Sequence, residues 1–357
     1  MKQIYFPLRF PSKFLVFLVL SSCLTPIDFP VEIKGGTLVV SGQISNLSDQ
    51  NFVQLGTTAK IAQLPFPVSG ATIQLFDDVG NVYLYEEDVQ NLGMYYLKNE
   101  VGIAGRTYYI QIDLIDGGSY KSLPEKLPEP TLQESVSYTI VKKEFTDKEG
   151  AVVMQDYFDL YSNSELLPSN EPIYLKWGVE EVFLLSPTDF PDPFGNIPPP
   201  CFVIQNADPQ RIVLFNGSEV TSTSINNLLV GSRLIDWSFL ERHYFTIYQS
   251  SITKEAYDYW RKVNIVANQV GTIFDTPPAT ITGNLISKEN PKEKTLGYFQ
   301  ATNQTYNRFF VFPSDLPFPL TVTTCAFTGS FNSLEYPARC IDCTTVRNSS
   351  YTRPDWF

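Results

Sequence analysis

The chain has 357 residues, a formal net charge of −12 at neutral pH and an isoelectric point near 4.7. An acidic chain cannot neutralise the negative charge of phosphates, so we expect no binding to nucleic acid and no electrostatic attachment to anionic lipid. Hydrophobic residues make up 43% and charged residues 18%, as in a folded protein. The length exceeds that of a typical single hydrophobic core, so two domains are expected.

Residues 1–22 have the pattern of a secretory signal peptide. An unbroken apolar run over 14–20 follows three basic residues, Lys2, Arg9 and Lys13. The run is shorter than the ~20 apolar residues of a membrane-spanning helix. The next residues, Leu-Ser-Ser-Cys23, resemble a bacterial lipobox, which implies cleavage before Cys23 and lipidation of that cysteine. The alternative is an ordinary signal peptide with an incidental cysteine.

Residues 23–35 contain two prolines and no periodicity, and we expect them to form a tether. Short strand patterns with regular turn signals fill 36–123. In the clearest of them, Ala71, Ile73 and Leu75 alternate with polar residues, and the Asp77–Asn81 segment is a hairpin turn. Six or seven such strands predict an antiparallel β-sandwich.

A proline-rich strip over 124–131 is the expected linker to a C-terminal β-rich domain at 132–357. Strands are expected on both sides of a polar hairpin tip at 142–150. The proline-rich loop ending at Pro200 is an expected contact surface. One main helix is predicted over about 253–270, capped by Thr253. The predicted fold class is therefore mostly β with one main helix.

Four cysteines remain after Cys23, namely Cys201, Cys325, Cys340 and Cys343. An even number in an exported protein indicates disulfides, and the three pairings stay open. The Cys340-Ile-Asp-Cys343 spacing also occurs in zinc and redox sites. A zinc site would need further ligands, and the chain contains one histidine.

Catalytic, metal-binding and cofactor-binding residues are not predicted. His243 lies in a strand-like segment without a Gly-x-Ser-x-Gly elbow, which favours a structural histidine over a hydrolytic base. A calcium site among neighbouring carboxylates is the alternative to a solvated hairpin face, and lacks the spacing of a known calcium loop. These carboxylates are Asp77, Asp78, Glu86, Glu87 and Asp88.

Aromatic residues suggest a platform for sugar or peptide. They are Trp177, Trp237 and Trp260, with Tyr257 and Tyr259. Tyr259 and Trp260 share the apolar face of the predicted helix, so core packing is the favoured interpretation for them.

Several phrases occur together in a specific order. They are the lipobox, Leu38-Val-Val-Ser-Gly42, Pro67-Val-Ser-Gly-Ala71, Glu255-Ala-Tyr-Asp-Tyr-Trp260, Gly271-Thr-Ile-Phe-Asp275, Gly283-Asn-Leu285, Leu296-Gly-Tyr-Phe299, Cys340-Ile-Asp-Cys343 and Asp355-Trp-Phe357. The set resembles an outer-membrane lipoprotein family of Bacteroidota with unknown function. The resemblance implies an immunoglobulin/prealbumin-like N-terminal sandwich and an outer-membrane lipoprotein encoded beside TonB-dependent receptors, with no catalytic residues to transfer.

We therefore expect a non-enzymatic lipoprotein, anchored in the outer membrane through Cys23, that associates with a TonB-dependent receptor in substrate capture or complex assembly. Exposure at the cell surface is expected. The periplasmic face is the alternative, because the export signal of such surface lipoproteins is typically an acidic run just after the cysteine, and here only Asp28 and Glu32 are acidic. The other hypotheses are a surface module that binds glycan or peptide alone and a hydrolase with an unrecognised site.

Overall fold

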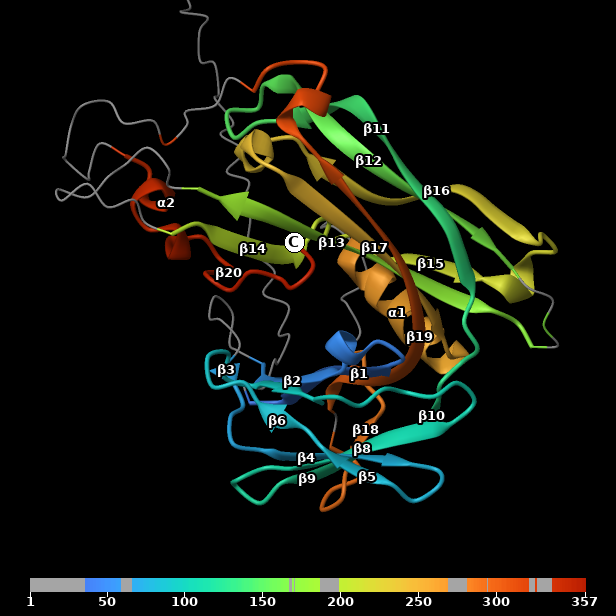
Figure 1. Cartoon of the computed structure of the whole chain (residues 1–357). Helices are drawn as coiled ribbons and strands as arrows, with labels where there is room; N and C mark the ends of the chain where they lie inside the picture. The colour runs from blue at the N-terminus through green and yellow to red at the C-terminus, as the bar shows by residue number, and fades with distance from the viewer. Residues whose placement is uncertain are drawn as a thin grey trace, which may run out of the picture.

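The computed structural model describes residues 36–58, 66–166, 169, 171–186, 199–268, 281–293, 295–320, 325 and 336–357. Within these residues the chain forms three β-sheets and one long helix, which confirms the predicted fold class. The predicted signal peptide and tether, Cys23 included, lie outside the described residues. Two layered lobes share the largest sheet, one below and one above in Figure 1.

The N-terminal lobe is a sandwich of two sheets. One layer is part of the eleven-stranded sheet and consists of β1 (Leu38–Ser45), β2 (Phe52–Thr57), β3 (Phe66–Pro67), β6 (Glu86–Glu87) and β7 (Met94–Tyr96). The other layer is the six-stranded sheet of β4 (Thr72–Asp77), β5 (Val82–Leu84), β8 (Thr107–Asp113), β9 (Ser119–Ser122), β10 (Glu125–Lys126) and β18 (Leu285–Ser287).

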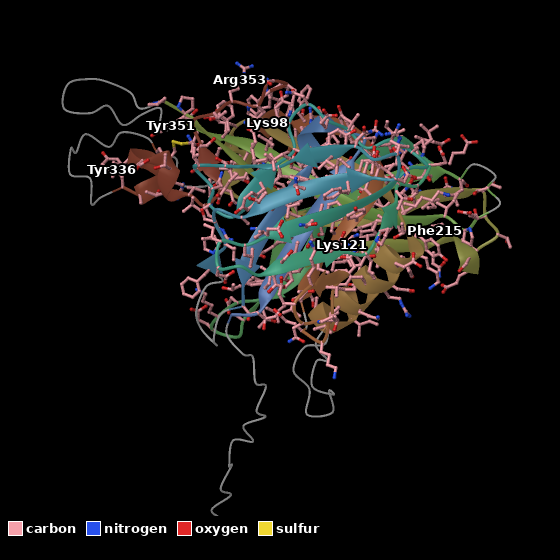
Figure 2. All side chains as sticks on the ribbon, turned by 90° about the horizontal axis from the view of Figure 1, so that it is seen from below. Lys98, Lys121, Phe215, Tyr336, Tyr351 and Arg353 are labelled. Atoms are coloured by element: carbon pink, nitrogen blue, oxygen red, sulfur yellow. A yellow bond between two sulfur atoms is a disulfide. The ribbon has the colours of Figure 1, made fainter. Side chains whose placement is uncertain are left out.

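Alternation in sequence accounts for the core between these two layers. Ile73 and Leu75 of β4 are buried while Thr72 is exposed, as the period-two pattern predicts. They pack in one cluster with Val40 of β1 and Ile110 of β8. The opposite side of the six-stranded sheet, which faces the viewer in Figure 2, carries polar side chains such as Lys121.

The C-terminal lobe is built on the rest of the eleven-stranded sheet, namely β13 (Tyr174–Leu185), β14 (Cys201–Asn206), β15 (Val213–Asn216), β17 (His243–Ile252), β19 (Leu296–Val311) and β20 (Ser349–Ser350). The three-stranded sheet of β11 (Leu132–Thr146), β12 (Val152–Glu165) and β16 (Ser224–Leu234) covers one face of it. Phe158, Leu175, Trp177, Phe245 and Ile247 fill the space between these sheets. Strand β11 continues through the expected tip, so the turn is confined to 147–150.

Strand β19 joins the two lobes. Its first half pairs in parallel with β1, and its second half pairs antiparallel with β17. This orange-red strand runs from the lower lobe into the upper lobe in Figure 1. Because β18 and the start of β19 return to the N-terminal lobe, residues far beyond position 123 complete the sandwich. The predicted domain limits themselves stay a prediction.

The main helix, α1 (Lys254–Asn268), packs on the eleven-stranded sheet beside the junction of the lobes. Its cap is the predicted one, because the Ala256 amide donates to Oγ1 of Thr253 at 3.1 Å. The predicted end of the helix near residue 270 lies outside the described residues. Ala256 is fully buried, and the Tyr259 ring lies 4.8 Å from the ring of Tyr298 of β19 in a tilted arrangement.

Two disulfides link the four predicted cysteines. Cys201 pairs with Cys343, and Cys325 pairs with Cys340. The two cysteines of the Cys340-Ile-Asp-Cys343 phrase therefore bond to different partners, in the region around Tyr336 in Figure 2. The first bond ties the C-terminal segment of α2 (Ala338–Ile341) and η6 (Cys343–Thr345) to the start of β14.

Candidate functional site

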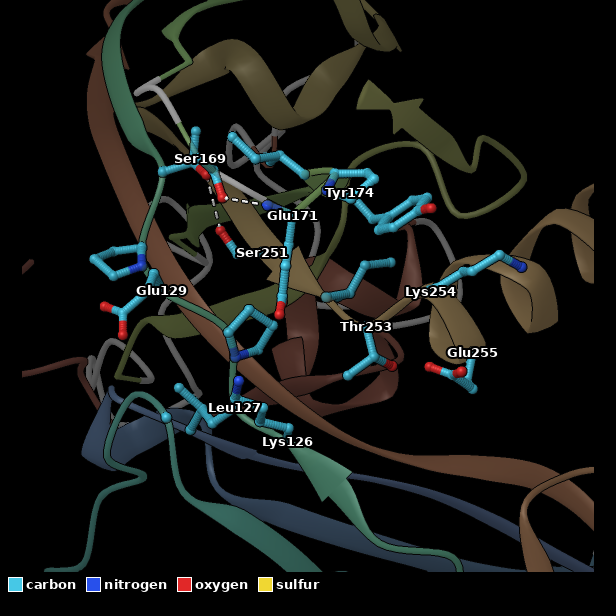
Figure 3. Close-up of a pocket in the computed structure, with 17 residues that line it drawn as sticks. Lys126, Leu127, Glu129, Ser169, Glu171, Tyr174, Ser251, Thr253, Lys254 and Glu255 are labelled. Atoms are coloured by element: carbon cyan, nitrogen blue, oxygen red, sulfur yellow. Dashed lines mark hydrogen bonds between the residues drawn. The ribbon is translucent and has the colours of Figure 1, made fainter. Parts of the chain in front are cut away.

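A cavity of about 810 Å³ lies at the junction of the lobes, and we call it the waist pocket. One wall is the proline-rich segment after β10, from Lys126 to Thr131. The other walls come from residues 171–174 at the start of β13 and from the end of β17 with the first residues of α1. Figure 3 shows these three segments around the cavity. Cavities of this size and position commonly hold small ligands.

Hydrogen bonds from the shared sheet hold the proline-rich wall in place. Asn303 of β19 donates to the Pro128 carbonyl at 3.2 Å, and Gln249 of β17 donates to the Thr131 carbonyl at 2.9 Å. Thr305 adds a second bond to Thr131 at 3.1 Å. The segment predicted as a linker is thus a fixed part of the pocket.

Glu125 fastens this wall to the helix and to β19 from behind the pocket. Its side chain is buried, and it accepts hydrogen bonds from the Thr253 hydroxyl at 2.6 Å and from the Tyr298 hydroxyl. Burial raises the pKa of Glu125 to about 7, and the nearby charge of Glu255 acts in the same direction. Because Thr253 also caps α1, Glu125 joins three elements that meet at the pocket.

The pocket lining combines apolar surface with charges of both signs. Three prolines, Leu127, Ile173 and Ile252 supply the apolar part. Lys126, Glu129, Glu171 and Glu255 line the same space, and none of these four forms an ion pair with another residue that the structure describes. The pocket therefore offers free charged groups to a ligand.

His243 is structural rather than catalytic in its surroundings. The ring is fully buried, stacks at 4.0 Å on Phe239, and places Nε2 at 2.9 Å from the buried Glu181 carboxylate. Arg233 donates to the same oxygen of Glu181 at 2.6 Å, and Gln205 donates to the other oxygen. A substrate cannot reach a ring enclosed in this way, so the geometry favours the structural interpretation.

The carboxylates considered for calcium serve separate local purposes. Asp77 binds the amides of its own turn and an Arg106 guanidinium at 2.8 Å, and turn hydrogen bonds lower its pKa against the effect of burial. Glu87 accepts from the Gly70 and Gly93 amides, while Glu86 pairs with Lys98. Asp88 caps a turn of its own, and Asp78 accepts from the Thr107 amide. Throughout the described residues, no cluster of three metal-binding side chains occurs.

The aromatic candidates divide between core and surface. Trp177 is buried in the C-terminal core, and Trp237 stacks edge-on against Phe183. Trp260 is partly exposed and donates from Nε1 to Gln300 at 2.8 Å. Tyr257 contacts Tyr174 beside the waist pocket. Most of the expected loop before Pro200, from 187 to 198, lies outside the described residues.

The far end of the β11–β12 hairpin exposes apolar side chains. Strand β12 pairs with β16 from Tyr157 onward, so residues 142–156 extend as a ribbon of two strands. Phe145, Val152, Val153 and Met154 are exposed on this ribbon, with Val152 65% and Met154 55% accessible. Phe145 lies opposite Val153 in the pairing, and Val152 and Met154 alternate with Val153, so both faces of the ribbon are apolar. We call residues 142–156 the hairpin end.

Sequence reasoning missed Glu125 and the waist pocket. Glu125 stands between two prolines and carries no local pattern, and its partners lie 128 and 173 positions away. A charged residue in a proline-rich strip is ordinary for a linker, and its burial depends on contacts that only the folded chain creates.

No helix among the described residues is long and apolar enough to cross a membrane. Comparison with curated proteins finds no match. The sequence model of one family matches residues 24–308, which is most of the chain and includes both lobes. The chain belongs to that family, described as a domain of unknown function (DUF4249).

Proposed function

We propose that this protein is a non-catalytic accessory lipoprotein of the outer membrane, anchored by lipid on Cys23, which docks on a TonB-dependent receptor and helps to capture its substrate. The lipobox and the basic and apolar residues before it support the anchor. The lipid would confine the protein to two dimensions and raise its effective concentration near a membrane partner.

The hairpin end is the observation that carries the docking proposal. A ribbon of two strands is only marginally stable in water, and this one exposes apolar groups on both faces. Single exposed apolar residues are common, but four within one short ribbon indicate a surface that another protein covers. A ribbon with two apolar faces fits a groove between loops better than a flat surface.

The waist pocket supports the capture part of the proposal. Its walls come from both lobes, and four of its charged side chains, Lys126, Glu129, Glu171 and Glu255, have no ion-pair partner among the described residues, whereas Lys254 pairs with Asp258. A pocket of this size with a partly apolar lining suits a small ligand.

Affinity purification from native membranes in mild detergent tests the docking. The wild-type protein should retain a β-barrel receptor, and the double variant Phe145→Ser/Met154→Ser should lose it. A control, Phe66→Ser/Val89→Ser, changes two apolar residues of the N-terminal lobe that are even more exposed, and it should retain the receptor. Equal recovery of the receptor by all three proteins would refute docking through the hairpin end.

Fractionation of cells tests the anchor. Cys23→Ser should leave the protein folded but release it from the outer membrane. Retention of this variant in the outer membrane at wild-type levels would contradict the anchor.

A module that binds glycan or peptide alone is the second candidate, and the waist pocket supports it. The same purification separates the two, because a module acting alone retains no receptor in wild-type form.

A further inference from the structure

The eleven-stranded sheet has a second face in the C-terminal lobe, opposite the core that the three-stranded sheet covers. We call it the outer face. Three neighbouring rows of paired residues cross it. In the middle row, Gly178 of β13 pairs with Tyr248 of β17, which pairs with Tyr306 of β19. The row on one side contains Glu180, Thr246 and Arg308, and the row on the other side contains Lys176. Side chains of alternate residues thus gather on one surface.

Aromatic rings surround Gly178 on this face. Trp260 of α1, held by its hydrogen bond to Gln300, lies 3.9 Å from the Lys176 ammonium. Near the other end, the Trp356 ring lies 3.4 Å from the Arg308 guanidinium. Tyr248 and Tyr306 are 5.7 Å apart between them. Four rings therefore border one stretch of sheet.

The middle of this face lacks a side chain at Gly178, and we call the open space above it the hollow. A Cβ added at Gly178 would meet nothing within 4 Å, although the residue lies in the interior of a central strand. Lys176, two residues earlier on β13, is partly exposed, and burial lowers its pKa to about 8.

The polar groups of the hollow come from both lobes. Gln50 of η1 (Ser48–Gln50) donates to the Tyr248 hydroxyl at 3.3 Å, and the charge of Asp49 acts on Glu180. Lys176 and Glu180 form no ion pair with any residue that the structure describes. Their positions along β13 are about 13 Å apart. Charges of both signs thus stand on either side of the hollow, with Lys176 over the Trp260 ring and Glu180 near Arg308 and Tyr248.

We infer that the outer face binds a neutral oligosaccharide across Gly178, with its sugar rings against Trp260, Tyr306 and Trp356. Aromatic faces pack against the C–H faces of sugars, and on Trp260 and Trp356 this is the side that Lys176 and Arg308 do not cover. The polar groups between the rings can donate to and accept from hydroxyls. An anionic ligand would meet Glu180 and Asp49, and a cationic ligand would meet Lys176 and Arg308. A neutral ligand rich in hydroxyls avoids both of these like-charge repulsions. This site goes beyond the proposed function, which places capture in the waist pocket.

Calorimetric titration of the full-length protein in detergent tests the inference. The probes are cellotetraose, maltotetraose, laminaritetraose and xylotetraose, with tetragalacturonate and tetraalanine as charged and peptide comparators. At least one neutral tetrasaccharide should bind. Gly178→Val fills the hollow and Trp356→Ala removes a ring, and each should weaken binding about tenfold.

Two controls keep the result clear. Phe66→Ala removes a more exposed ring in the other lobe and should bind as the wild type does. Melting temperatures near that of the wild type show that Gly178→Val and Trp356→Ala are folded, and if one unfolds the other decides. Binding of none of the neutral probes, tighter binding of a comparator, or unchanged binding in a folded variant would overturn the inference. None of these results depends on a receptor.

Discussion

Replacement of Glu125 by glutamine changes how stability depends on pH. The carboxyl is buried against Thr253 and Tyr298, and burial raises its pKa to about 7 from an ordinary value of 4.5. Its contribution is full below pH 4.5 and is lost as the pH rises toward 7, because the folded chain then holds a proton that the unfolded chain has released. The charged group facing it is Glu255, on the first turn of α1.

The size of the effect follows from that shift in pKa. A rise in pKa from 4.5 to about 7 corresponds to about 3 kcal/mol, most of which falls between pH 5 and pH 8. Glutamine keeps the shape and the hydrogen-bonding capacity but does not titrate. The wild type should therefore lose about 2–3 kcal/mol relative to Glu125→Gln over this range.

Urea unfolding of both proteins at pH 5 and pH 8 measures this difference. Comparison of the two proteins at each pH cancels the titration of all other groups. The stability gap should change by about 2–3 kcal/mol between the two pH values, with the variant favoured at pH 8. An unchanged gap would show that Glu125 titrates normally and that the description of the buried junction is wrong.

Three further substitutions test other parts of the fold by urea unfolding. Gly297→Ala should cost more than about 3 kcal/mol, because φ is 86° and a Cβ would lie 1.9 Å from the Val40 carbonyl oxygen. The control Gly80→Ala, at a residue with φ 94° and open space around it, should cost about 1 kcal/mol. Equal costs would contradict the close approach of Gly297 to Val40. Loss of the Cys201–Cys343 bond should cost about 5 kcal/mol and loss of the Cys325–Cys340 bond about 3 kcal/mol, because the first bond closes the longer loop. The reverse order of costs would contradict this pairing. Glu181→Leu should cost about 3–5 kcal/mol, because buried Arg233 and His243 lose the carboxylate they share and Arg233 keeps only Asp236 as an ion-pair partner among the described residues, while the exposed Glu86→Leu should leave the midpoint unchanged.

Local patterns predicted much of the fold. The alternation around Ile73, the turn before Asn81 and the cap at Thr253 are all present, because each depends on residues close in sequence. The pairing of β19 with strands of both lobes could not be predicted from local patterns. It depends on parallel pairing between residues 39–45 and 296–302, and nothing in either strand specifies a partner so far along the chain.

The structure explains two of the short sequence motifs that carry the family resemblance, Gly283–Leu285 and Leu296–Phe299. A Cβ on Gly283 would lie 1.8 Å from the Gly297 carbonyl, and Asn284 exchanges two hydrogen bonds with the Phe299 backbone. These residues secure the place where β19 meets β1. The site residues were less predictable, because Glu125, Lys176 and Trp260 become neighbours of a cavity or hollow only through contacts between distant strands.

The most direct test of the central proposal is the protein composition of the complex purified from native outer membranes in mild detergent. The account predicts that a TonB-dependent receptor co-purifies with the wild-type lipoprotein in a fixed stoichiometric ratio. Recovery of the lipoprotein alone, under conditions that keep other receptor complexes intact, would contradict it.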